Sequence, residues 1–92
     1  MNQIIEIELS DIEKLKDILI VDIREREEFL EKNIGGINIP AHEITTRIGE
    51  LETKENLVIV CSNGLRSSIM ARVIHKKIPN ANIYHLSEGI FQ

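Results

Sequence analysis

The chain has 92 residues and a formal net charge of −4, and 42% of its residues are hydrophobic and 28% charged. These values predict one small soluble domain over residues 1–92, because a chain of this size does not form separate cores. The acidic balance argues against nucleic acid as a partner, since nucleic acid selects basic surfaces. No apolar run approaches the roughly 18 residues of a membrane span, and the N-terminus lacks a signal-peptide pattern. We therefore expect no membrane contact and a cytoplasmic location.

The first half of the chain alternates strand and helix patterns. Residues 4–9 alternate apolar and polar side chains and predict an edge strand. A capping-box pattern at 10–13 predicts a helix that begins at Ser10 and ends near Asp17. Residues 19–23 read as a buried strand with a carboxylate near its end, and 24–32 as a short charged helix. We expect Phe29 and Leu30 to be the apolar contacts of that helix.

The second half continues the alternation. Residues 35–40 predict a turn and a short strand, and the apolar spacing of 42–51 predicts a helix. Residues 57–60 are all apolar and predict a strand covered on both faces. A helix follows, with Ser67 or Ser68 as its N-cap, and 82–86 form a fifth strand. This order predicts an α/β fold: a mostly parallel five-stranded sheet with helices on both faces.

The loop between the fourth strand and its helix carries the candidate chemistry. Cys61, the sole cysteine, follows the strand directly, with Gly64 and Arg66 close behind it. A helix N-terminus and a curled loop both direct N–H groups inward, and Arg66 adds a cation. A cysteine in this setting has a depressed pKa, which makes Cys61 a candidate nucleophile and not an inert core residue.

No other constellation competes with Cys61. A single cysteine excludes an intramolecular disulfide and a multi-thiolate zinc site. The three histidines show no metal-ligand spacing, so we assign none of them a role. His85, near a strand end, is the strongest of the three candidates. We expect no metal and no cofactor, and we expect an outside molecule to discharge any persulfide or oxidised state of Cys61.

The pattern Cys-x-x-Gly-x-Arg-Ser at 61–67 resembles the active-site loop of single-domain rhodanese-like sulfurtransferases. The run from Asp22 to Phe29 and the Ile-Asn-Ile-Pro run at 37–40 are similar to other signatures of that family. The resemblance implies a rhodanese-like fold and a Cys61 persulfide that moves a sulfane sulfur from donor to acceptor. It also implies that Asp22 and Arg24 support the loop. The expected sulfur-binding residues are Ser62, Asn63, Gly64, Leu65, Arg66 and Ser67.

The spacing of the loop favours sulfur transfer over phosphate chemistry. Protein tyrosine phosphatases and related arsenate reductases have one more residue between cysteine and arginine than the four residues found here. A shorter ring suits a terminal sulfur better than a tetrahedral oxyanion. We expect a small sulfur-donor anion such as thiosulfate, or a persulfide donor. The expected acceptor is cyanide, a protein thiol or a low-molecular-weight thiol. The alternatives are a non-catalytic interaction or sulfur-carrier module and, less favoured, a phosphatase or arsenate reductase.

Overall fold

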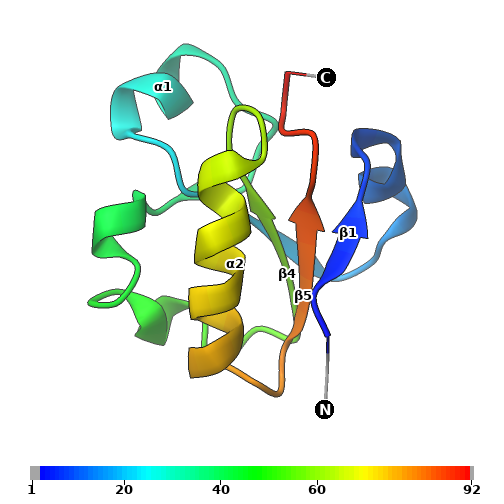
Figure 1. Ribbon diagram of the computed structural model, residues 1–92, viewed down its shortest axis with the longest axis vertical. Coiled ribbons are helices and arrows are strands. Elements are labelled where there is room, and N and C mark those ends of the chain that lie inside the picture. Colours follow the sequence, from blue (N-terminus) through cyan, green and yellow to red (C-terminus); the bar gives the residue numbers. More distant parts are fainter. Residues whose placement is uncertain (1–2, 92) are drawn as a thin grey trace.

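Strands and helices alternate along residues 3–91, the part of the chain that the computed structural model describes (Figure 1). Two α-helices and three short 3₁₀-helices connect the strands. The strands are β1 (Ile5–Ile7), β2 (Ile18–Asp22), β3 (Ile37–Asn38), β4 (Asn56–Val60) and β5 (Asn82–Leu86). The α-helices are α1 (Arg26–Glu31) and α2 (Leu65–Lys77), and the 3₁₀-helices are η1 (Leu9–Lys14), η2 (Ala41–Glu43) and η3 (Ile48–Glu50).

The five strands form one sheet in the order β1-β5-β4-β2-β3, and every neighbouring pair is parallel. The predicted fold class is therefore confirmed. β4 is the central strand, so its carboxyl end lies between the ends of β5 and β2. That edge of a parallel sheet is where α/β folds place their ligands, and Cys61 lies there.

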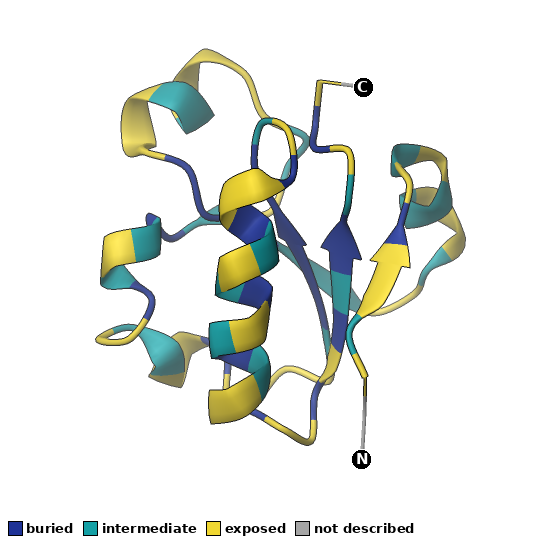
Figure 2. Ribbon diagram, viewed as in Figure 1, coloured by how far each residue is buried: buried dark blue, intermediate teal, exposed yellow. Residues whose placement is uncertain are grey.

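Alternating side chains of β4 build a core on each face of the sheet. Figure 2 shows β4 coloured as buried along most of its length. Leu57 and Ile59 pack on one face with α2 and with residues 41–51. Val58 and Val60 pack on the other face, which η1 and the residues around it cover. All four side chains are fully buried, and each contributes about 1.5–3 kcal/mol relative to an exposed position. Cys61 continues the alternation onto the α2 face.

Two predicted helices differ from the structure, one in its type and cap and the other in a side-chain contact. The segment expected to begin at Ser10 is the 3₁₀-helix η1, and its capping box joins Glu8 to Asp11. The Asp11 carboxylate accepts a hydrogen bond from the Glu8 N–H at 2.9 Å, so Ser10 does not cap this helix. In α1, Leu30 is 73% exposed and does not make the expected apolar contact.

The helix predicted over 42–51 is also wrong as a continuous element. Only the short η2 and η3 form there, joined by turns. Ile44 and Leu51 are nevertheless fully buried, so the apolar spacing indicated the correct buried residues. The β-branched pair Thr45 and Thr46 and the following Gly49 all disfavour helix, and turns with 3₁₀-type hydrogen bonds bury the same two side chains.

Candidate functional site

The loop after β4 curls around the sulfur of Cys61. The backbone N–H groups of Gly64 and Ser67 point at Cys61 Sγ, with N···S distances of 3.2 and 3.3 Å. Gly64 is the N-cap of α2 and has a φ of +90°, in the left-handed region that favours glycine. A Cβ at Gly64 would also collide with the carbonyl of Ser87. The loop therefore depends on glycine for its curl and for its contact with the chain after β5.

The hydrogen bonds to Cys61 outweigh its burial. Burial alone raises the pKa of the Cys61 thiol, because a charged sulfur is costly away from water. The Ser67 hydroxyl and the backbone N–H groups of Ser67, Gly64 and Asn63 favour the thiolate, and the pKa of Cys61 lies below its ordinary value. A low pKa increases the fraction of thiolate, the nucleophilic form of cysteine.

Two details of the loop differ from the sequence-based expectation. The N-cap of α2 is Gly64, so Ser67 and Ser68 lie within the first turn and do not cap the helix. The Leu65 N–H, which was expected to face the sulfur, donates instead to Asn63 Oδ1 at 3.1 Å. Asn63 thus holds the outer side of the loop. The Leu65 side chain is 73% exposed and points away from the core.

Arg66 lies at the rim of the loop and is already paired. Its two terminal nitrogens bind both carboxylate oxygens of Glu28 on α1, at 2.9 and 3.0 Å. One of them also donates to Ser62 Oγ at 3.1 Å. The hydrogen bond from Arg66 is the main reason that the pKa of Glu28 is lowered to about 2. A cavity of about 220 Å³ lies beside this rim, and its lining residues are Arg24, Glu28, Glu31, Lys32, Ser62 and Phe91.

Asp22 and Arg24 form a buried ion pair beside the loop. Two side-chain nitrogens of Arg24 donate to the Asp22 carboxylate, with a shortest N···O distance of 2.8 Å, and both residues are almost fully buried. Arg24 also donates to the carbonyl of Lys32 at 2.6 Å and lies 5.7 Å from the centre of the Phe91 ring. The pair therefore ties β2 to the end of α1 and to the segment after β5, and it makes no direct hydrogen bond to Cys61.

The segment after β5 braces the back of the loop. The Ile90 N–H donates to the carbonyl of Cys61 at 3.0 Å, and the Phe91 N–H donates to that of Ser62 at 3.4 Å. Gly89 has a φ of +79°, and a Cβ there would collide with the Ser62 carbonyl. One glycine at this position is therefore enough to let the two segments touch.

His85 and Glu6 belong to this neighbourhood, although no role is expected for either from the sequence. His85 Nε2 lies 2.7 Å from Ser67 Oγ, and its Nδ1 lies 2.7 Å from a carboxylate oxygen of Glu6. The register of β1 against β5 pairs Glu6 with His85. Only the order of the strands brings these two residues together. The single available signal was the position of His85 one residue before the end of a predicted strand.

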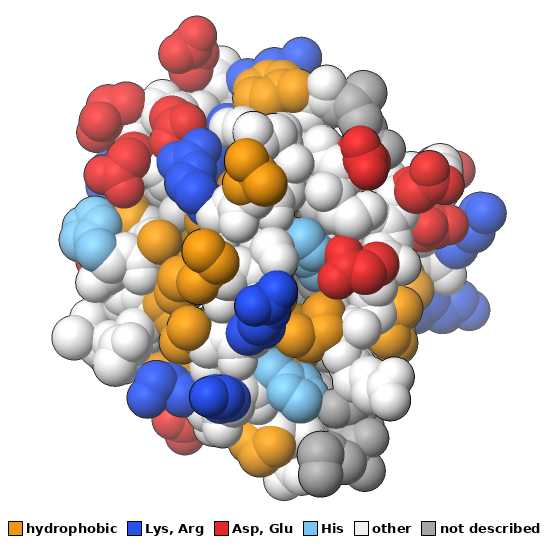
Figure 3. All heavy atoms as spheres, viewed as in Figure 1, with side chains coloured by type: hydrophobic (Ala, Val, Ile, Leu, Met, Phe, Trp, Pro, Cys, Tyr) orange, Lys and Arg blue, Asp and Glu red, His pale blue; other side chains and the backbone are white. Residues whose placement is uncertain are grey.

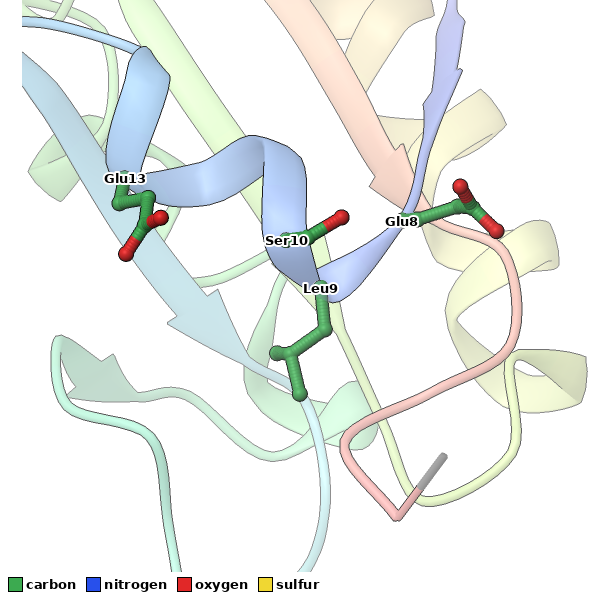
Figure 4. Close-up of a pocket in the computed structure, with 4 residues that line it drawn as sticks. All are labelled: Glu8, Leu9, Ser10 and Glu13. Carbon is green, nitrogen blue, oxygen red and sulfur yellow. The ribbon is translucent and has the colours of Figure 1, made fainter.

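A larger hollow of about 530 Å³ lies along η1 and is lined by Glu8, Leu9, Ser10 and Glu13 (Figure 4). Its labelled side chains point in different directions, and none of them comes from the Cys61 loop. Within residues 3–91, no three His, Cys, Asp or Glu side chains gather as a metal site. No helix in this range is long and apolar enough to cross a membrane. The Cys61 loop is therefore the candidate functional site.

Comparison with known proteins agrees with the fold and the loop. Residues 7–92 match the family model of the rhodanese-like domain. The chain belongs to the rhodanese-like domain family. This assignment covers every strand of the sheet except the first residues of β1, and it includes the whole of the Cys61 loop.

Individual relatives place this rhodanese-like chain among proteins of several sizes. A stretch of 59 residues is 37% identical to YrkF of Bacillus subtilis (strain 168), whose name describes it provisionally as a sulfur carrier protein. The match covers 63% of this chain and about a third (32%) of YrkF. A NAD-dependent persulfide reductase from A. fulgidus is 33% identical, with a TM-score of 0.72 over 95% of this chain and 15% of that one.

A third relative has a length close to that of this chain. A rhodanese-related protein from Thermoplasma volcanium is 25% identical, with a TM-score of 0.78. The superposition covers 94% of this rhodanese-like chain and 86% of the other. The matching domain therefore makes up most of one solved chain and a small part of another. At the level of the family, these relatives connect the chain with sulfur transfer.

Proposed function

We propose that this rhodanese-like domain is a sulfurtransferase that carries a sulfane sulfur as a persulfide on Cys61. One observation carries the proposal: a buried cysteine with a lowered pKa receives hydrogen bonds from the N–H groups of Gly64 and Ser67. The same donors suit the thiolate before the reaction and a persulfide anion after it. Each charge-assisted hydrogen bond contributes about 1.5–3 kcal/mol.

The reaction has two balanced halves. The Cys61 thiolate attacks the outer sulfur of thiosulfate, the S–S bond of the donor breaks, and sulfite leaves with the electron pair. Cys61 then holds the outer sulfur as a persulfide anion. An acceptor nucleophile, cyanide or a thiolate, attacks that outer sulfur and releases the Cys61 thiolate. Alternation between two enzyme forms predicts ping-pong kinetics.

Some of the surrounding residues hold the Cys61 loop in place, and Arg66 lies where a sulfur donor would enter. Ser62 accepts a hydrogen bond from Arg66, and Asn63 accepts one from the Leu65 N–H, so both residues fix the loop. The buried Asp22–Arg24 ion pair lies beside the loop and supports it. Cys61 has no exposed surface, so a donor reaches the sulfur only when the rim shifts. Arg66 is a cation at that rim, and an anion that binds it competes with the Glu28 carboxylate.

Apolar side chains around the loop support a protein thiol as the acceptor. Leu65 and Ile69 lie one turn apart on α2 and are 73% and 61% exposed. Figure 3 shows apolar side chains between charged ones on the face that carries α2. Protein interfaces have an apolar centre and a polar rim, and this face offers both next to the reactive sulfur.

The test is a pair of assays on the wild-type chain and Cys61→Ser. We expect the wild type to form thiocyanate from thiosulfate and cyanide, and we expect no hydrolysis of p-nitrophenyl phosphate. Cys61→Ser should form no thiocyanate above background, because serine does not form the persulfide. Activity with the phosphate ester alone would replace the proposal with a phosphatase.

A sulfur-carrier module is the second candidate, and the similarity to YrkF favours it. A carrier would be loaded at Cys61 in the same way but would give its sulfur only to a specific partner. The two candidates differ in the second half-reaction. Rapid discharge of the loaded chain by cyanide and by dithiothreitol supports a sulfurtransferase, and a persulfide that resists both supports a carrier.

A further inference from the structure

A continuous line of polar groups leads from the edge strand β1 to the sulfur of Cys61. The Glu6 carboxylate lies 2.7 Å from His85 Nδ1, and His85 Nε2 lies 2.7 Å from Ser67 Oγ. The backbone N–H of Ser67 is bonded to Cys61 Sγ at 3.3 Å, and the Ser67 hydroxyl is one of the groups that favour the Cys61 thiolate. His85 is 3% exposed, so these two partners replace the water that an imidazole would otherwise bind.

The chemistry of the groups allows two arrangements of the protons. An ionised Glu6 only accepts hydrogen bonds, so His85 Nδ1 carries a proton in both arrangements. When His85 is neutral, Nε2 accepts from the Ser67 hydroxyl, and the Ser67 oxygen is free to accept from a Cys61 thiol. When His85 is an imidazolium, Nε2 donates to Ser67 Oγ, and the Ser67 hydroxyl donates to a Cys61 thiolate. The 2.7 Å between His85 Nε2 and Ser67 Oγ suits a hydrogen bond in either direction.

We propose that Ser67, His85 and Glu6 form a proton relay that ionises Cys61. In one step the thiol proton passes to Ser67 Oγ and the Ser67 hydroxyl proton passes to His85 Nε2. The thiol and neutral imidazole become a thiolate and an imidazolium, and no proton is gained or lost. Glu6 balances the new charge on His85. Ser67 contacts the reacting sulfur, whereas His85 and Glu6 are positioning residues that act through it.

The groups packed around His85 agree with this role. β1 contributes the Glu6 carboxylate, and the residue paired with His85 on β4 is the apolar Ile59. α2 contributes Ser67, and farther along it carries Arg72 and His75. The Ser67 hydroxyl is also one of the groups that lower the pKa of Cys61. The groups that face His85 are therefore one carboxylate and one hydroxyl, with an apolar neighbour on β4.

The test measures how fast a neutral reagent, iodoacetamide, alkylates Cys61 across a range of pH, because only the thiolate reacts. Ser67→Ala and His85→Asn should each raise the apparent pKa of Cys61 by about one unit, the loss of one charge-assisted hydrogen bond. Glu6→Gln should move it in the same direction, since the amide keeps the shape but not the charge. The control Glu13→Gln removes the same charge from an exposed position on η1 and should leave the profile unchanged.

The double variant shows whether Glu6 affects the pKa of Cys61 through Ser67, as in a relay, or independently of it. If Glu6 and His85 act only through Ser67, then Glu6→Gln adds nothing in a Ser67→Ala background, and the double variant matches Ser67→Ala alone. Additive shifts, or a Glu6→Gln profile equal to the wild type, would overturn the relay. The Glu6 side chain is 59% exposed, so Glu6→Gln decides the question even if the buried His85→Asn variant does not fold.

The role of the relay in sulfur transfer rests on the proposed function, whereas the alkylation test of the relay does not depend on that function. If the variants shift the pKa of Cys61 in a non-additive way but the chain forms no persulfide, the relay proposal stands and the sulfurtransferase proposal is rejected. Normal thiocyanate formation together with additive or absent shifts would keep the sulfurtransferase and reject the relay.

Discussion

Cys61 illustrates how opposing local effects set the chemistry of one side chain. The alternation of β4 directs it into the core on the α2 face, where burial favours a neutral thiol. The turn at Gly64 brings donors to the same sulfur and reverses the direction of the pKa shift. The same residue would be an inert core cysteine if the loop did not curl back over it.

Glu28 provides a pH test of the rim. Its pKa is about 2 in the folded chain against an ordinary value of 4.5, so its pairing with Arg66 stabilises the fold fully above pH 4.5. That contribution is lost as the pH falls from 4.5 through 2. We expect Glu28→Gln to be less stable than the wild type at pH 7, by no more than about 1 kcal/mol because the pair is solvent-exposed. Urea unfolding at a series of pH values measures the difference.

The difference between the two chains should shrink toward zero near pH 2. The side-chain amide introduced by Glu28→Gln keeps an oxygen that can accept the hydrogen bond from the Glu25 N–H, so capping of α1 is preserved. Glu27→Gln on the same helix is the control, and we expect it to track the wild type at every pH. A gap between wild type and Glu28→Gln that stays constant down to pH 2 would contradict the ion pair.

The contact between the Cys61 loop and the segment after β5 depends on the left-handed backbone of Gly89 and on its missing side chain. We expect Gly89→Ala to lower the free energy of unfolding by about 2–4 kcal/mol, since it adds left-handed strain and a collision with the Ser62 carbonyl. The variant should also alkylate more slowly at Cys61, because the displaced loop no longer directs its donors at the sulfur.

Gly49→Ala is the matched control for that variant. A Cβ at Gly49 would meet no atom within 4 Å, so we expect a change within about 0.5 kcal/mol. Thermal or urea unfolding of both variants measures the effect. Equal stability of the two alanine variants would mean that the loop and the closing segment do not need their close contact.

The elements with strong apolar patterns could be predicted, and the short ones could not. Residues 57–60 lie within β4, because buried parallel strands require near-continuous apolar side chains. Residues 82–86 form a strand with the predicted bounds although Asn82 and His85 interrupt the apolar run. The helix over 42–51 fails because burial of Ile44 and Leu51 constrains only two side chains and leaves the backbone between them open to turns. The N-cap of α2 moves to Gly64 because a left-handed residue already ends the loop there.

The topology of the sheet explains which parts of the site could be predicted. Cys61, Gly64 and Ser67 are close in sequence, so the loop is visible as a local pattern. Glu6 and His85 are 79 residues apart, and they meet only because β1 pairs with β5 at the edge of the sheet. Alternating strands and helices predict a parallel sheet, but they do not give the order of its strands.

A sulfurtransferase of this kind requires that Cys61 accept a single sulfur atom from a donor. The most direct measurement is the intact mass of the chain after incubation with thiosulfate and removal of the excess donor. We predict a gain of one sulfur atom on the wild type, its loss after addition of cyanide, and no gain on Cys61→Ser. An unchanged mass for the wild type, or the same gain on Cys61→Ser, would contradict the proposed persulfide.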